Sequence, residues 1–246
     1  MWSRTASSMP MAARGRFRQA VEDMTESWLW ELANHIQNRI PDPIDYIEMR
    51  RKTFGSDLTM SLSRLAHDET VPPEIYRTST MRGLDNSAAD YACLTNDIFS
   101  YQKEIQFEGE LHNCVLVVQN FLNCDLRQAV DIVNDLMTSR IRQFQHIVDT
   151  ELPVLFTNFD LDESAQEVLN GYVGELQDWM AAFCCGTGRA RYDESELSYP
   201  PTTARPVNGP TGLGTAAAHL GSFLRAGAPA PGAEAPVTRG ATAPAI

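Results

Sequence analysis

Three polar residues with oxygen-bearing side chains recur every four positions in the segment "NDIFSYQKE". They are Asn96, Ser100 and Glu104. In an α-helix this spacing puts them on one face, with a rise of roughly 6 Å between neighbours. An amide, a hydroxyl and a carboxylate are hard oxygen ligands, the kind that Mg²⁺ takes together with water and substrate phosphate. Lys103 lies beside the carboxylate and could reach an anion held by that metal. The pattern therefore predicts a magnesium site that binds a phosphorylated substrate.

The alternative interpretation of this segment is a solvated helix face with a polar start. A capping box does not explain it, because the third residue after Thr95 is Ile98 and the third after Ser100 is Lys103, whereas the box needs Glu or Gln. Apolar residues on both sides of the motif favour a helix that is largely buried.

The elements that must position this motif are helices. Apolar residues recur at intervals of three and four, and the alternation expected of half-buried strands is absent. The predicted helices cover 16–40, 44–66 with an interruption near 53–55, 84–107, 111–122, 125–151 and 160–185, with a loop or short turn at 71–83. This pattern predicts an all-α bundle with an interior large enough for a ligand.

Composition narrows the class of protein further. The 246 residues are 43% hydrophobic and carry a formal net charge of −12. This charge argues against nucleic acid or an anionic membrane surface as a partner, and therefore against a DNA-binding regulator. Five cysteines without a C-x-x-C pair favour reduced thiols in a cytoplasmic protein rather than disulfides or zinc. We expect a flexible N-terminus over 1–14, a helical domain over 15–194, and a disordered tail rich in Pro, Gly and Ala over 195–246.

The motif also resembles a known family. N-D-[LIV]-x-S-x-x-K-E is similar to the second metal motif of class I terpene synthases, and the run "NDIFSYQKEIQFEGELHNCVLVVQNFL" resembles bacterial germacradienol/geosmin synthases, in particular their C-terminal domain. The resemblance covers roughly residues 15 to 183. It implies a class I terpene synthase-like helical bundle in which Asn96, Ser100 and Glu104 chelate one Mg²⁺ bound to the substrate diphosphate, and Lys103 contacts that diphosphate.

Further site residues follow from the resemblance. An arginine that contacts the diphosphate is expected in "MRRKTFG", with Arg50 as the choice and Arg51 as the alternative, and Arg191 with Tyr192 matches a pair that closes over the diphosphate. The implied reaction is Mg²⁺-dependent carbocation chemistry on farnesyl diphosphate or on germacradienol.

The chain also departs from the family. It contains no D-D-x-x-[DE] motif, and "CCGTGRA" stands where a helix is expected. We therefore expect an N-terminally truncated synthase whose own activity stays open and whose exposed apolar faces favour a homo-oligomer. The competing hypothesis is a non-catalytic helical fragment or interaction module.

Overall fold

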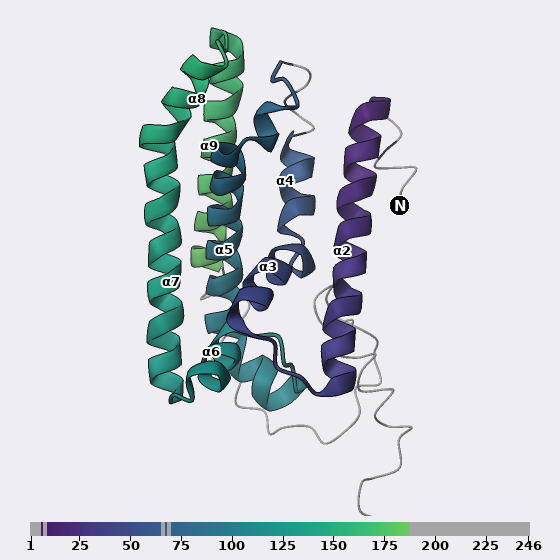
Figure 1. Ribbon diagram of the computed structural model, residues 1–246, viewed down its shortest axis with the longest axis vertical. Helices are drawn as coiled ribbons and strands as arrows, with labels where there is room; N and C mark the ends of the chain where they lie inside the picture. The colour runs from purple at the N-terminus through teal and green to yellow at the C-terminus, as the bar shows by residue number, and fades with distance from the viewer. Residues whose placement is uncertain (1–5, 7–8, 65–66, 68–69, 187–246) are drawn as a thin grey trace, which may run out of the picture.

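The computed structural model describes residues 6, 9–64, 67 and 70–186 of the chain, and all of its regular elements are helices (Figure 1). No strand occurs among these residues, which confirms the all-α prediction. The helices are α2 (Met11–Gln37), α3 (Pro43–Thr53), α4 (Ser56–Arg64), η2 (Ile75–Arg77), α5 (Ser79–Gln102), η3 (Lys103–Glu108), α6 (Cys114–Leu122), α7 (Leu126–His146), η4 (Ile147–Glu151), α8 (Leu152–Asn158) and α9 (Glu163–Gly186). None of the described helices is both long enough and apolar enough to cross a bilayer. The tail expected over 195–246 lies outside the described residues.

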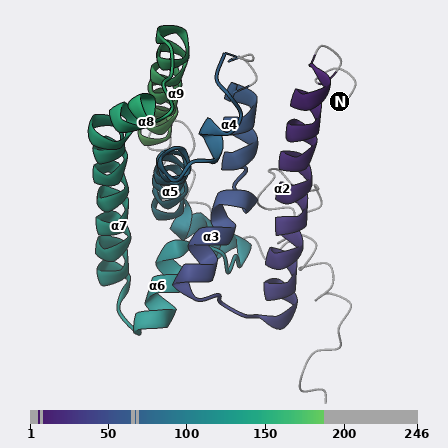
Figure 2. The same ribbon diagram turned by 45° about the horizontal axis from the view of Figure 1, so that its top comes forward.

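Helix α5 occupies the centre of the bundle, and the other long helices are arranged around it. It packs against α7, α9, α6 and α3, while α2 stands at the opposite edge from α7 and packs on α3 and α4 (Figures 1 and 2). The helix that carries the polar motif is therefore covered on several sides.

The predicted interruption near residues 53–55 is a sharp break between α3 and α4. Asp42 caps the start of α3 by accepting hydrogen bonds from the backbone N–H groups of Ile44 and Asp45, and Pro43 suits the first turn. Gly55 follows the helix with φ of 82°, a backbone conformation that favours glycine. This break directs α3 toward the polar motif while α4 turns toward α9.

The helix predicted over 84–107 differs from the observed one at both ends. It begins at Ser79, where Thr78 caps it with a hydrogen bond from the N–H of Met81. Its last turn, Lys103–Glu108, is a π-helix that ends at Gly109, with φ of 66°. Such wide turns occur frequently at functional sites, and here the turn contains Glu104.

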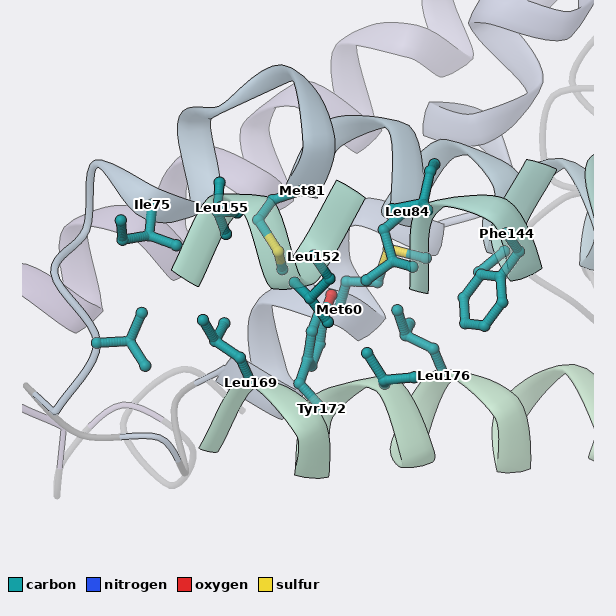
Figure 3. Packing of buried hydrophobic residues seen from close by; sticks show 14 of the residues in the cluster. Met60, Ile75, Met81, Leu84, Phe144, Leu152, Leu155, Leu169, Tyr172 and Leu176 are labelled. Carbon is teal, nitrogen blue, oxygen red and sulfur yellow. The ribbon is translucent and has the colours of Figure 1, made fainter. Parts of the chain in front are cut away.

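Most of the apolar core lies where α5, α8 and α9 meet. Figure 3 shows Leu169, Tyr172 and Leu176 of α9 facing Met81 and Leu84 of α5. A second cluster joins α3, α5, α6 and α7 around Tyr46, Leu94, Val117 and Val133. Burial of these side chains drives the packing of helices whose own propensity is modest.

Helix α2 departs most from its predicted pattern. It begins at Met11, so residues 11–14 of the expected flexible N-terminus are helical. Ile36 continues the apolar periodicity of this helix but is 61% exposed, and the buried residues near the end of the helix are polar: Ser27, Glu31, Asn34 and His35. Partners from distant segments, described below, explain the burial of Asn34 and His35.

Candidate metal and diphosphate site

The predicted metal ligands lie at the end of α5 and in the π-helix that continues it. Asn96 and Ser100 are buried in α5, and Glu104 follows in the π-helix, where it is half-buried. The hydroxyl oxygen of Ser100 is fully buried, and no hydrogen bond of ordinary geometry satisfies it among the described residues. It lies near enough to Glu104 to lower the pKa of that carboxyl. A buried oxygen without a partner fits a ligand of a hard metal ion.

Arg50 reaches this group of residues from the end of α3. Its Nη2 donates to Oδ1 of Asp97 at 2.8 Å and to Oδ1 of Asn96 at 3.2 Å, and its Nε lies 3.2 Å from Oδ1 of Asp97. Arg50 is 8% exposed, and its guanidinium carbon lies 5.2 Å from the centre of the Phe54 ring. A buried cation therefore stands directly beside the predicted metal ligands.

Asp97 is the residue that fixes Arg50. Its carboxylate is fully buried, and its Oδ2 accepts hydrogen bonds from the Tyr46 hydroxyl at 2.5 Å and the backbone N–H of Cys114 at 3.0 Å. With Arg50 on Oδ1, the carboxylate is paired and hydrogen-bonded, as a buried charge must be. Asp97 thus links α3, α5 and the start of α6 at one point.

The charge of Glu104 depends on these neighbours. Burial raises the pKa of its carboxyl to about 7, Arg50 opposes that rise, and Asp97 adds to it. Asn113 donates from Nδ2 to Oε2 of Glu104 at 3.0 Å and to the backbone oxygen of Asp97 at 2.8 Å. A divalent cation in contact with the carboxylate would favour its charged form.

The second arginine of the doublet points elsewhere. Arg51 makes a two-pronged contact with Asp90, through Nε at 2.6 Å and Nη2 at 2.8 Å, and Arg140 of α7 binds the same carboxylate at 2.9 Å. Arg51 therefore joins α3 to α5 and α7, whereas Arg50 lies next to Asn96.

The other predicted contacts to the diphosphate are not brought to this group by the described structure. Lys103 is about half exposed and pairs with Glu108 at 3.0 Å. Arg191 and Tyr192 lie outside the described residues.

A second buried polar group lies beside the first and joins α2 to the segment between η3 and α6. Oε1 of Glu110 lies 2.8 Å from both Nε2 of His35 and Nδ1 of His112, an arrangement of ligand atoms that could hold a metal ion. Nε2 of His112 lies 3.2 Å from the Nδ2 of Asn34, whose Oδ1 accepts from Arg39. This assigns the amide orientation, so Nε2 accepts and Nδ1 carries the proton donated to Glu110. The hydrogen bonds account for the group without a metal.

A row of aromatic rings leads away from Arg50. The ring of Phe54 lies 5.4 Å from Phe183, which lies 5.2 Å from Trp179 of α9. Trp179 borders a hollow of about 140 Å³ between α4 and α9, whose other lining residues include Met60 and Leu176. The predicted metal ligands and Arg50 do not line this hollow, but the row of aromatic rings connects the hollow with Arg50.

Sequence reasoning missed Asp97, Tyr46, Asn113 and the polar face of α2. Asp97 lies inside the motif. It is one residue away from Asn96, Ser100 and Glu104 in their four-residue spacing, so the spacing gave no sign that it is buried. The letters "HN" before an apolar run do carry a signal for Asn113, because Asn is a strong helix N-cap. In the structure Asn113 takes that role, since its Oδ1 accepts a hydrogen bond from the N–H of Val115. No spacing rule links Tyr46 to a residue 51 positions away.

Comparison with known proteins shows the family to which the sequence is similar. Residues 1–143 match the family described as terpene synthase family 2, C-terminal metal binding. The chain is 32% identical over 179 residues to sesquiterpene synthase 1 of Postia placenta, covering 73% of this chain and 51% of that protein. It is 24% identical over 199 residues to pristinol synthase of Streptomyces pristinaespiralis, covering 80% and 53%.

The fold also matches solved structures. Linalool/nerolidol synthase from Streptomyces clavuligerus, in complex with 2-fluorogeranyl diphosphate, superimposes with a TM-score of 0.69 at 22% identity, covering 78% of this chain and 63% of that one. The chain spans about half the length of the curated relatives that it matches.

Proposed function

The chain belongs to the class I terpene synthase family, and on that premise we propose that Asn96, Ser100, Glu104 and Arg50 form the site that binds Mg²⁺ and the diphosphate of a prenyl substrate. The observation that carries this proposal is the meeting of Arg50 with Asn96 beside the unsatisfied buried hydroxyl of Ser100. A surface helix face would place these groups in water and would not bring a cation from another helix.

The donor set suits a magnesium ion. An amide oxygen, a hydroxyl and one carboxylate supply hard ligands but only one negative charge, so water and the substrate diphosphate would complete the coordination. When bound, Mg²⁺ supplies Lewis acidity that stabilises charge on the departing diphosphate.

The chain's own residues carry the other parts of the mechanism. Arg50 holds a positive charge in a buried position and orients it through Asp97, so it can bind a diphosphate oxygen without first reorganising. Its hydrogen bonds to Asp97 and Asn96 use Nε and Nη2, so among the described contacts Nη1 remains for such an oxygen. Lys103 would have to leave Glu108 to contribute.

The hydrocarbon part of the substrate would extend along the aromatic row of Phe54, Phe183 and Trp179. Aromatic faces stabilise a nearby cation and exclude the water that would quench a carbocation. The motif supports a prenyl diphosphate as the substrate class, and so do relatives named sesquiterpene synthase and pristinol synthase. We propose farnesyl diphosphate as the substrate and a cyclase of the germacradienol/geosmin type as the parent activity. Germacradienol, an alcohol, offers no diphosphate for Arg50 and the metal ligands.

The test is calorimetric titration of residues 1–246 with inorganic diphosphate in the presence and absence of MgCl₂. We expect binding that needs Mg²⁺, that Glu104→Gln removes, and that Arg50→Met weakens. Arg51→Met is the matched control, because it removes the adjacent part-buried arginine, whose guanidinium binds Asp90. Equal binding by wild type and Glu104→Gln would favour the alternative, a helical fragment or interaction module without catalytic function.

A further inference from the structure

The segment between the π-helix and α6 is fixed to the helix that contains the metal ligands. After Gly109 turns the chain, the backbone N–H of Glu110 donates to the backbone oxygen of Glu104 at 2.9 Å. Three residues later Asn113, which is fully buried, caps α6 and donates from Nδ2 to both Glu104 and the backbone of Asp97. The same side chain thus ends one element and contacts a proposed metal ligand.

The other side of this segment is fixed to α2. Oε1 of Glu110 accepts from the backbone N–H groups of Leu111 and His112, at 2.7 and 2.9 Å, and from the two histidine rings. His35 reaches Glu110 from α2, and Asn34 reaches His112. Both His rings help to hold the pKa of the Glu110 carboxyl well below its usual range, against the effect of its burial. The segment therefore cannot move without breaking several buried hydrogen bonds.

Glu104 needs such support because of where it lies. A π-turn departs from α-helical geometry, so the four-residue spacing from Ser100 does not by itself fix where the Glu104 carboxylate points. The side-chain contact that aims Oε2 is the bond from Asn113. The position of Asn113 depends in turn on the preceding residues, Glu110 to His112.

We propose that His35, Glu110, His112 and Asn113 are positioning residues that hold the Glu104 carboxylate in its metal-binding orientation. His35 contributes this support from α2, and the other three residues from the segment before α6. This inference rests on the proposed function, since it assigns these residues to the same site. It extends the site to α2, a helix that supplies none of the proposed metal ligands. Loss of such supporting hydrogen bonds lowers metal affinity by about 10- to 100-fold in other proteins.

The test measures Mg²⁺-dependent binding of inorganic diphosphate by variants of residues 1–246, together with their unfolding in urea. His35→Ala removes the donor on α2, and His35→Gln keeps an N–H near the place of Nε2. Asn113→Ser keeps a side chain that caps α6 but removes the amide that binds Glu104. Ser27→Ala is the matched control, because Ser27 is a buried polar residue of the same helix whose hydrogen bond goes to Met24 of α2 itself.

We expect His35→Ala and Asn113→Ser to bind Mg²⁺ and diphosphate about 10- to 100-fold more weakly than wild type. His35→Gln should recover most of the affinity, and Ser27→Ala should bind as wild type even where it unfolds at lower urea. The proposal is overturned if His35→Ala and Asn113→Ser bind normally while Glu104→Gln does not. It is also overturned if His35→Gln is as weak as His35→Ala, or if Ser27→Ala weakens binding equally. If wild type fails to bind, or Glu104→Gln binds normally, the proposed function itself fails.

Discussion

At the scale of residues, the site depends on two carboxylates, Asp97 and Glu104, that are seven positions apart and differ in how their charge is balanced. Asp97 is buried with a cation, a hydroxyl and a backbone N–H around it, so its charge is balanced. Glu104 accepts a hydrogen bond from Asn113, and burial raises the pKa of its carboxyl to about 7. The first carboxylate holds the arginine, and the second is left for a metal ion.

The raised pKa of Glu104 makes stability fall as pH rises. Between pH 4.5 and about 7 the folded protein keeps a proton on this carboxyl that the unfolded chain has released. We expect the free energy of unfolding of wild type, relative to Glu104→Gln, to drop across that window by at most about 3 kcal/mol and to level off above it. Urea unfolding of both proteins from pH 4.5 to 8, without Mg²⁺, measures the difference. A constant difference across this range would contradict the assigned pKa.

Removing Asp97 should cost more than removing any single partner. Asp97→Ala leaves the buried guanidinium of Arg50 without its carboxylate, and we expect a loss of about 3–5 kcal/mol in the free energy of unfolding. Tyr46→Phe removes one hydrogen bond to the same carboxylate and should cost about 1.5–3 kcal/mol. Urea unfolding at pH 7 measures both. If Asp97→Ala were no less stable than Tyr46→Phe, the pairing of Arg50 with Asp97 would not be the main support of this region.

At the scale of elements, three irregular features place the site residues. The break between α3 and α4 ends α3 at the point where Arg50 reaches α5. The π-helix of η3 contains Glu104, and the turn at Gly109 returns the chain toward α2. Each feature is stabilised by tertiary contacts, since none would persist in an isolated helix.

Gly55 tests the first of these features. With φ of 82° and the Sδ of Met24 3.2 Å from the place of an added Cβ, Gly55→Ala should lower the free energy of unfolding by about 1–3 kcal/mol. Gly171→Ala is the matched control, because that glycine lies exposed within α9 with no atom within 4 Å of an added Cβ. The control should leave stability unchanged or raise it by up to about 1 kcal/mol. Equal effects of the two changes would remove the argument that the break requires glycine.

At the scale of the whole molecule, the part of the chain that the structure describes brings the metal motif and the buried Arg50 together in a bundle with α2 at its edge (Figure 2). Ionising an allylic diphosphate demands that several positive charges act together on the leaving group. The 246 residues contain no D-D-x-x-[DE] motif that would hold further metal ions.

We therefore expect residues 1–246 to bind Mg²⁺ and diphosphate but to turn over farnesyl diphosphate slowly. Incubation with Mg²⁺ and extraction of hydrocarbon and alcohol products for gas chromatography measures this, with Glu104→Gln as the background. Product well above that background would show that this single motif suffices, and would contradict the expectation.

The sequence by itself determined the local features, because helical periodicity, the Gly55 break and the four-residue spacing are encoded by neighbours along the chain. It was enough to predict the all-α fold, the family and the buried position of Asn96 and Ser100 within one helix. Spacing alone did not separate Arg50, chosen on the resemblance, from Arg51, since adjacent residues differ only in which neighbour each meets across the bundle: Asn96 for one, Asp90 for the other. Ile36 continues the apolar periodicity of α2, yet the tertiary structure leaves it exposed and buries Glu31, Asn34 and His35. Burial of a polar side chain is favourable only when partners meet it, and Glu110 and His112, more than seventy positions away, become partners only once the chain has folded.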